Sequence, residues 1–405
     1  MSGAPRRVVV SGTGYSRIAR HANEPIGLLA VEAAQRALDE AGLTTDDVDG
    51  LANFPAAGHA SAGSVDGIDY VGTGYLAGAL PARNLRWQAS VQPGDFISSM
   101  VAGMHAIAAG TCEVVLAWRA MHNPSSRPYG QVAVPAAVGE YEYTAPYGIG
   151  DALSRYAMPY SRYLSKYGAS REQMATFIVN NRRNAAMNPD AVFYQRPVTA
   201  EDYLSARMIV EPFSVLDCDM PVDGAGAVVL TTEANARSAR YPAAYLSGHA
   251  TLGVARGIPA NTILEDHQQA AAQGAAALWS TTRLTPGDVD SANLYDGFSY
   301  FTYLYLEALG FCAEGEAAGF IQDGRIALDG KLPLNTSGGS LGMGRVHGPP
   351  QVIESVRQLQ GRCGERQIAR PGVILAVTGQ PNYSAGYMLF TREPTPPRPG
   401  TAEHA

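Results

Sequence analysis

The 405-residue sequence has little of several features that mark other classes of protein. Its four cysteines are scattered without a CxxC pair, which argues against a zinc knuckle or a disulfide framework and favours a reducing compartment. Its net charge of -7 argues against a nucleic-acid partner, whose binding requires a concentrated basic face. No apolar run approaches the roughly 20 residues that a membrane span needs. These absences predict no metal site, no nucleic-acid partner and no membrane span.

The start of the chain also lacks a secretory signal. A run typical of a β-strand begins at Val8, which leaves no room for a charged region, an apolar region and a cleavage site. We therefore expect a cytoplasmic protein. What the sequence does have is 46% hydrophobic and 17% charged residues, enough for a large buried core.

A repeat is present inside the chain. Residues 43–49 (LTTDDVD) are echoed 241 positions later by residues 284–290 (LTPGDVD), and each copy follows a helix-like stretch and precedes a strand-like one. Short apolar runs at residues 114–118 (VVLAW) and 373–377 (VILAV) form a second pair, typical of buried central strands. The matched Asp-Val-Asp sequence favours a duplicated α/β core over chance alternation.

Between these halves, residues 122–205 break the pattern. Prolines and many tyrosines crowd into this insertion, among them Tyr129, Tyr141, Tyr143, Tyr147, Tyr156, Tyr160, Tyr163 and Tyr167. An insertion of this length in a compact domain is usually a lid, a binding wall or a dimer contact. We expect it to cover the active site, although its helix-like piece at residues 154–163 is equally compatible with an interface helix.

Two motifs resemble those of the thiolase superfamily. Residues 216–230 (LDCDMPVDGAGAVVL) resemble the end of the family's N-terminal half, and residues 335–344 (NTSGGSLGMG) resemble the glycine-rich loop that carries its second catalytic histidine. Within the superfamily, the sequence is most similar to sterol-carrier-type lipid-transfer thiolases, and among them to the steroid side-chain-cleaving aldolases. This likeness spans nearly the whole chain.

The resemblance implies an α/β thiolase fold. Two duplicated βαβαβαββ halves would form a five-layered α-β-α-β-α arrangement, normally as a homodimer with residues 114–118 and the turn near Gln92 close to the two-fold axis. The N-terminal half would span residues 1–240, including the tyrosine-rich insertion at about 122–205. The C-terminal half would span residues 241–392, followed by a proline-rich tail at 393–405.

The thiolase nucleophile is missing from this sequence. Thiolases attack a thioester with a cysteine thiolate at the turn before the helix that ends here at Gly110. That turn, residues 91–96 (VQPGDF), contains no cysteine, and the serines near it lack a histidine base at the family position. The four cysteines elsewhere are explained as small core or loop residues. We therefore expect no acyl-enzyme.

The other thiolase groups are replaced as well. The histidine of the family's Gly-His-Pro stretch corresponds to Arg345, which stays charged and cannot act as a base. The acid–base cysteine would fall near residues 377–379 (VTG), where there is no thiol. The asparagine or histidine of a further loop corresponds to Tyr295, and the aldolases have a tyrosine there too. They have a second tyrosine where this chain has Arg345. Either Arg345 stabilises an enolate while His347 or Tyr295 handles the proton, or the chain does different chemistry.

The surviving groups suit a reaction without a covalent intermediate. A retro-aldol cleavage needs a base on the β-hydroxyl, donors for the developing enolate and a proton source for the α-carbon. We predict Tyr295, Arg345 and His347 as catalytic residues, although Tyr295 is also explained by packing under the insertion and His347 by a hydrogen bond inside its turn. The predicted oxyanion and substrate-binding residues are Asn335, Gly338, Gly339, Thr378 and Gly379, because glycine lets backbone N–H groups approach a thioester.

The sequence thus favours a carbon–carbon lyase that acts on a bulky, steroid-like 3-hydroxyacyl-CoA. The alternatives are a non-catalytic acyl-CoA-binding subunit of a thiolase-like complex and a non-covalent acyltransferase. No cofactor is expected, because the substrate is carried as a coenzyme A thioester. The resemblance further implies a small partner protein with a zinc ribbon and an OB-fold.

Overall fold

The two halves of the chain repeat a similar order of strands and helices. The computed structural model describes residues 6–54, 71–92, 94–122, 137–149, 152–253, 262–382 and 384–395. The N-terminal half contains β1 (Val8–Tyr15), α1 (Ile26–Ala41), β2 (Gly50–Asn53), α2 (Thr73–Ala79), β3 (Trp87–Ser90), α3 (Phe96–Ala108), β4 (Val114–Met121) and β7 (Gly224–Thr232). The C-terminal half contains β8 (Ala244–Gly253), α7 (Leu264–Ser280), β9 (Ser291–Asn293), α8 (Tyr300–Ala308), α9 (Ala317–Phe320), α10 (Gly339–Met343), α11 (Pro349–Leu359), β10 (Val373–Gln380) and β11 (Ser384–Thr391).

Strand order confirms the duplication. Among the described residues, nine strands form one sheet in the order β3-β2-β4-β7-β1-β8-β11-β10-β9. The halves join where Val9 and Val10 of β1 pair with β8. Outward from this junction the N-terminal half runs β1-β7-β4-β2-β3 and the C-terminal half runs β8-β11-β10-β9. Leu334 forms a parallel bridge to Ala292 of β9, in the place that corresponds to β3.

The repeated Asp-Val-Asp sequence has the same structural role in both halves. The carboxylate of Asp49 accepts hydrogen bonds from the backbone N–H groups of Glu113 and Val114, where β4 begins. The carboxylate of Asp290 accepts them from Gly372 and Val373, where β10 begins. The repeat seen in the sequence therefore corresponds to the same contact with the start of a neighbouring parallel strand in each half.

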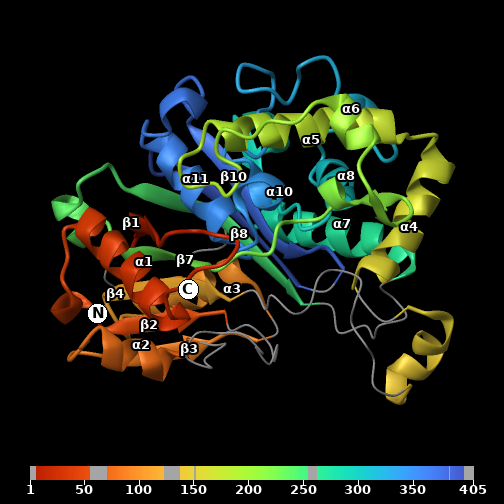
Figure 1. The fold of residues 1–405 in the computed structure, drawn as a ribbon. Coiled ribbons are helices and arrows are strands. Elements are labelled where there is room, and N and C mark those ends of the chain that lie inside the picture. The colour runs from red at the N-terminus through yellow and green to blue at the C-terminus, as the bar shows by residue number, and fades with distance from the viewer. Residues whose placement is uncertain are drawn as a thin grey trace.

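The elements form five layers (Figure 1), and three groups of buried side chains fill the spaces between them. The first lies between α1, α2 and the N-terminal strands and includes Leu116. The second surrounds α3 and α11 between the two half-sheets and includes Val115 and Ile374. The third lies between the C-terminal strands and α7 and α8 and includes Leu375. Consecutive residues of β4 and of β10 enter different cores because side chains of a strand point to alternate faces. The predicted α-β-α-β-α arrangement is confirmed.

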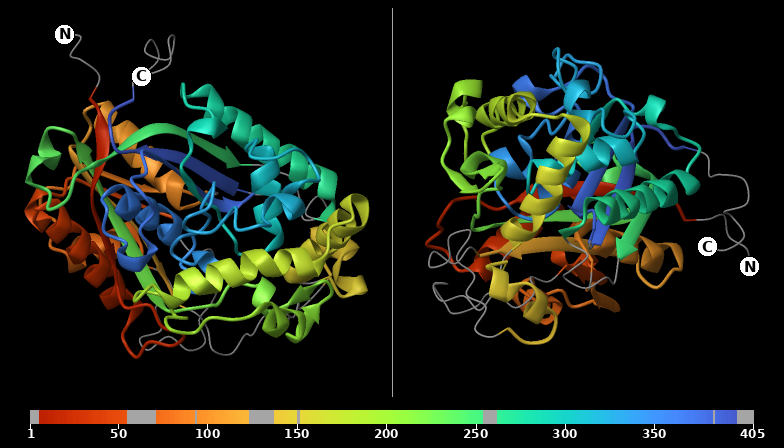
Figure 2. Two further views of the ribbon diagram at one scale, coloured as in Figure 1. Left: turned by 90° about the horizontal axis from the view of Figure 1, so that it is seen from above. Right: turned by 90° about the vertical axis from the view of Figure 1, so that its right-hand side faces the viewer.

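The insertion packs on the C-terminal half. It contains α4 (Ala152–Tyr167), α5 (Arg171–Ala186), α6 (Ala200–Leu204), β5 (Met208–Val210) and β6 (Phe213–Ser214). Figure 1 shows α5 beside α10, and Figure 2 shows α4 at the opposite end of the molecule from α1. Tyr156, Tyr160 and Tyr163 of α4 are buried, whereas Tyr143 and Tyr147 are 72% and 78% exposed.

Some predictions on chain organisation concern residues outside the described part. These are Tyr129, the side chain of Tyr141 and residues 396–405 of the tail. The limits of the halves and of the insertion stay a prediction. Across the described ranges, none of the helices combines the length and the apolar character that crossing a membrane requires.

Candidate active site

The N-termini of α3 and α11 meet where the two halves face each other. Gly348 precedes α11 and has a φ of +112°. A Cβ atom at Gly348 would lie 2.5 Å from Cβ of Phe96, the first residue of α3, and 3.2 Å from Cγ2 of Thr378 in β10. Only glycine permits this approach and this φ. The contact brings the turn before α3, the glycine-rich loop and the end of β10 to one place.

The turn before α3 holds a buried carboxylate in the region where a thiolase keeps its nucleophile. Asp95 is the N-cap of α3 and is 3% exposed. Its carboxylate accepts hydrogen bonds from the N–H groups of Ile97 (2.7 Å) and Ser98 (3.2 Å), from Ser98 Oγ (2.7 Å) and from the hydroxyl of Thr378. Burial raises the pKa of Asp95, and these bonds oppose the shift. The Ser98 hydroxyl thus donates to a carboxylate and not to a histidine.

The cysteines have environments that suppress their reactivity. Cys112, Cys218 and Cys363 are buried, and Cys312 is half-buried. Burial raises the pKa of Cys112 and of Cys312 to about 12, and it also raises the pKa of Cys363. A thiol with such a pKa is protonated at neutral pH and is a poor nucleophile.

The three predicted catalytic residues form one cluster. The Tyr295 ring, 4% exposed, lies edge-on to the imidazole of His347, with ring centroids 6.1 Å apart. Arg345 Nη1 lies 3.8 Å from Asp219 Oδ1, and the Arg345 backbone N–H donates to the carbonyl of Met220 at 2.8 Å. The charges of Asp219 and Arg345 both act on Tyr295. The structure therefore brings Tyr295, Arg345 and His347 together and adds Asp219, which the sequence analysis did not select.

Tyr295 has the properties of a proton donor. Burial raises the pKa of Tyr295 well above its ordinary value, the Asp219 carboxylate raises it further, and Arg345 lowers it. The phenol therefore keeps its proton at neutral pH. A Cβ atom at residue 297 would lie 2.5 Å from Tyr295 Oη, so Gly297 provides the room in which the hydroxyl lies.

Asp296 connects the Tyr295 loop to the glycine-rich loop. Its fully buried carboxylate accepts hydrogen bonds from the N–H groups of Ser340 (2.6 Å) and Leu341 (3.3 Å) at the start of α10. Side-chain amides of Asn181 (2.7 Å) and Gln351 (3.4 Å) also donate to it. Burial raises the pKa of Asp296 to about 7, although the N–H donors lower it. These contacts are structural, and they fix the two loops relative to each other.

The glycine-rich loop uses several of its own polar groups. Asn335 Oδ1 accepts from the N–H of Leu294 at 2.7 Å, while Asn335 Nδ2 is buried without a hydrogen-bond partner in the described part of the chain. The N–H of Gly338 donates to the Asn335 carbonyl at 2.8 Å, and that of Gly339 donates to Ser337 Oγ at 3.3 Å. An oxyanion role for Gly338 or Gly339 would require these bonds to be shared, so that role stays a prediction.

The end of β10 is contacted by the insertion. Gly379 has a φ of +79°, and its carbonyl accepts a hydrogen bond from the Tyr305 hydroxyl at 2.7 Å. Its neighbour Gln380 accepts one from the hydroxyl of Tyr156 in α4. The insertion therefore reaches the residue next to Gly379. The predicted roles of Thr378 and Gly379 toward substrate remain predictions.

A helix of the insertion contributes the residues that sequence reasoning missed. Asn180, Asn181, Asn184 and Asn188 are all buried, and their side-chain amides contact the two loops of the site. The sequence does contain a signal for them. Asparagine is unfavourable inside a helix, and four asparagines within nine residues indicate specific contacts.

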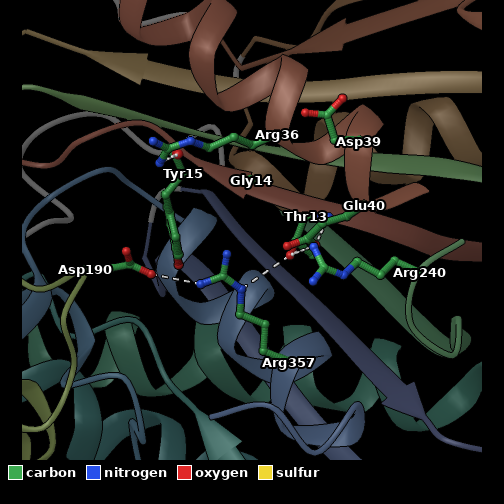
Figure 3. A pocket seen from close by; sticks show the side chains of 9 residues that line it. All are labelled: Thr13, Gly14, Tyr15, Arg36, Asp39, Glu40, Asp190, Arg240 and Arg357. Atoms are coloured by element: carbon green, nitrogen blue, oxygen red, sulfur yellow. Dashed lines mark hydrogen bonds and ion pairs between the residues drawn. The ribbon is translucent and has the colours of Figure 1, made fainter. Parts of the chain in front are cut away.

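A separate polar pocket of about 250 Å³ lies where the two halves and the insertion meet (Figure 3). Arg36 and Glu40 reach it from α1, Asp190 from the insertion and Arg357 from α11. Arg357 Nη1 is bonded to Asp190 Oδ2 at 2.9 Å, and acidic and basic groups are balanced along its wall. The predicted site residues do not line this pocket.

Comparison with known proteins places the chain in a family. Residues 261–389 match the model described as "Thiolase C-terminal domain-like". The steroid side-chain-cleaving aldolase of Thermomonospora curvata is 32% identical over 403 residues, which cover 94% of this chain and 97% of that protein. The chain belongs to the thiolase superfamily. Its likeness to the aldolase confirms the predicted branch of that superfamily.

Two further similarities support this thiolase-like assignment. The 17-hydroxy-3-oxo-4-pregnene-20-carboxyl-CoA lyase of Mycobacterium tuberculosis is 32% identical over 373 residues, 88% of this chain and 92% of that one. The solved structure of an Ltp2-ChsH2(DUF35) aldolase superimposes with a TM-score of 0.83 and 30% identity, covering 96% of this chain and 99% of that chain. The thiolase fold is therefore shared along almost the whole length.

Proposed function

We propose that this thiolase-like protein is a carbon–carbon lyase that cleaves a bulky, steroid-type 3-hydroxyacyl-CoA by a retro-aldol reaction. The observation that carries the proposal is the cluster of Tyr295, His347 and the Arg345–Asp219 ion pair. The turn before α3, where thiolases have their nucleophilic cysteine, contains Asp95 and no cysteine. Relatives at 32% identity are named as a lyase and an aldolase. The name of the lyase places a hydroxyl at carbon 17 and the carboxyl-CoA at carbon 20, which is a 3-hydroxyacyl-CoA pattern.

The proposed reaction breaks the bond between the α- and β-carbons. A base removes the β-hydroxyl proton, the C–O bond becomes a ketone or aldehyde carbonyl, and the electrons of the broken bond move onto the thioester enolate. A donor then protonates the α-carbon and releases a shortened acyl-CoA. No acyl-enzyme and no external oxidant or reductant is needed.

Each residue of the cluster suits one of these steps. Tyr295, whose raised pKa keeps its proton, donates to the α-carbon. His347 is half-buried beside the Tyr295 ring and accepts the β-hydroxyl proton. Arg345, held by Asp219, stabilises the enolate oxygen through its guanidinium. The buried Nδ2 of Asn335, in the glycine-rich loop, is a further donor that the described residues leave unused.

We also propose a homodimer that works with a small zinc-ribbon and OB-fold partner. Support for a partner comes from the solved structure of an Ltp2-ChsH2(DUF35) aldolase, whose name joins two proteins. The predicted two-fold axis lies near residues 114–118, which belong to β4, and near the turn at Gln92, which follows the edge strand β3. Light scattering at micromolar concentration tests the dimer, and a monomer would contradict it.

The decisive experiment is a cleavage assay with the recombinant chain and its co-purified small partner. Mass spectrometry should show a steroid-type 3-hydroxyacyl-CoA converted to a ketone or aldehyde and a shortened acyl-CoA. If the complex binds the thioester and leaves it intact, the acyl-CoA-binding subunit replaces the lyase. If the acyl group moves to an added acceptor, the protein is a non-covalent acyltransferase.

A further inference from the structure

One face of α5 is lined by buried asparagines. Asn180, Asn181 and Asn184 lie in this helix and Asn188 follows its end, and their exposed fractions are 5%, 0%, 0% and 2%. A buried amide is costly unless it is hydrogen-bonded, and asparagine is unfavourable inside a helix. Four of them in one short segment therefore indicate specific hydrogen bonds that outweigh helix propensity.

The side-chain amides of three of these asparagines donate hydrogen bonds to the glycine-rich loop and to Leu334 before it. Asn184 Nδ2 lies 3.2 Å from the carbonyl oxygens of both Leu334 and Asn335. Asn180 donates to the same Leu334 carbonyl at 3.2 Å, and Asn188 donates to the carbonyl of Ser337 at 3.0 Å. Among the described residues, the Leu334 carbonyl is therefore satisfied by side chains of the insertion, and the Asn335 carbonyl gains a donor beside the N–H of Gly338.

Asn181 acts on the other loop of the site. Its Nδ2 donates at 2.7 Å to Asp296 Oδ2, and the same carboxylate accepts the N–H groups of Ser340 and Leu341. Asp296 directly follows Tyr295 in the chain. Asn181 therefore connects α5, the Tyr295 loop and the start of α10 through a single buried carboxylate.

We infer that Asn181 and Asn184 are positioning residues of the active site, which hold the Tyr295 loop and the glycine-rich loop in the geometry that cleavage requires. The kinetic side of this inference rests on the proposed function. The insertion is then part of the catalytic scaffold. Because a small misplacement of catalytic groups costs on the order of 100-fold in rate, loss of either amide should lower kcat more than it raises KM.

The kinetic test compares Asn181→Ala and Asn184→Ala with Thr176→Val. Thr176 lies on the same helix, and its hydroxyl bonds to Gln322 at 2.7 Å, away from both loops of the site. We expect both asparagine variants to lose roughly 10- to 100-fold in kcat with little change in KM, and the threonine variant to keep wild-type kcat at a similar melting temperature. Equal kcat in all three variants would overturn the inference.

A second test needs no substrate, so it separates this inference from the proposed function. Hydrogen exchange should report the N–H groups of Ser340 and Leu341, which donate to Asp296. Asn181→Ala should speed their exchange by about tenfold or more relative to Thr176→Val. Unchanged exchange would refute the positioning role even if the enzyme cleaves its substrate. Faster exchange in a protein that cleaves nothing would support the role and reject the lyase.

Asn181→Asp provides a conservative variant if the alanine variant fails to fold. It places a second carboxylate beside that of Asp296. The other groups that act on Asp296 are the negative charge of Asp219 and the neutral hydrogen-bond donors of Ser340, Leu341 and Gln351. The two carboxyls can form an O–H···O bond only when one is protonated. Activity relative to wild type should therefore recover as the pH falls from 8 to about 6. A pH-independent ratio would contradict the inference.

Discussion

The hydroxyl of Thr378, near the end of β10, donates a hydrogen bond to the carboxylate of Asp95, the N-cap of α3. The two residues belong to different halves of the chain. They lie in the two segments where thiolases carry their nucleophilic and acid–base thiols. A buried hydrogen bond thus joins the halves in the region where related enzymes form an acyl-enzyme.

Replacing Thr378 by valine should destabilise the protein. The change keeps the shape of the side chain and removes one donor from a buried carboxylate, which costs about 1–3 kcal/mol of unfolding free energy. The loss should be larger at pH 7 than at pH 4, because burial raises the Asp95 pKa and only the ionised form depends fully on its donors. Urea denaturation measures both values. Thr302→Val is the matched control, since the Thr302 hydroxyl is buried without a partner in the described structure.

Tyr295→Phe should lower kcat with little effect on folding. Loss of a positioned general acid typically costs about 100- to 10,000-fold in rate, whereas removal of one hydroxyl changes the core volume very little. Steady-state kinetics and a melting curve separate the two effects. Tyr303→Phe makes the same chemical change in a buried tyrosine whose hydroxyl lacks a partner among the described residues. If both variants matched the wild-type rate, Tyr295 would not be the proton donor.

Thiol reagents should leave activity intact. The pKa values of Cys112 and Cys312 are raised to about 12 by burial, so neither thiol is ionised at neutral pH. Intact-protein mass spectrometry after incubation with substrate should show no acyl adduct. Rapid inactivation by one equivalent of iodoacetamide, prevented by substrate, would contradict a mechanism without an acyl-enzyme.

The repeat predicted a duplicated α/β core, and the resemblance to thiolases implied the five-layered arrangement of its halves. Asp49 and Asp290 each bond to the start of a neighbouring parallel strand, so one short motif marks the same connection in both halves. The short apolar runs at residues 114–118 and 373–377 then predicted that β4 and β10 are buried central strands. Resemblance to known motifs led to Tyr295, Arg345 and His347, which the structure brings into one cluster.

The supporting contacts were not predictable in the same way. Asn181 bonds to Asp296 across 115 positions of sequence, and Thr378 bonds to Asp95 across 283. Such pairs have no periodicity, because only the packed layers bring them together. The Asp219 partner of Arg345 was missed for the same reason, although its segment had been noted as a family motif.

Stability should fall in mild acid because of His249. In the unfolded chain His249 has the ordinary histidine pKa. In the folded protein, burial and the nearby His105 lower the pKa of His249 to about 4. Between pH 6.5 and 4 the unfolded state therefore takes up a proton that the folded state does not, so stability is full above pH 6.5 and is lost as the pH falls. The loss is roughly 3 kcal/mol at most. His249→Gln should flatten this part of the urea-stability profile, and an unchanged slope would exclude His249 as its source.

Arg345→Lys tests whether the charge alone is sufficient at the enolate. Negative charge moves onto the thioester oxygen as the carbon–carbon bond breaks, and a fixed donor is worth more in a water-poor site than in bulk water. Lysine keeps the positive charge near Asp219 but loses the planar guanidinium, which can donate to the carboxylate and to the enolate at the same time. We expect the variant to retain a minor share of kcat, with kcat and kcat/KM reduced together, because the missing interaction belongs to the transition state. Arg362→Lys is the control, since Arg362 pairs with Glu40 beside the separate polar pocket. Wild-type kinetics for Arg345→Lys would show that the guanidinium does not contact the developing charge. If Tyr295→Phe also had wild-type kinetics, the acyl-CoA-binding subunit would be the remaining interpretation.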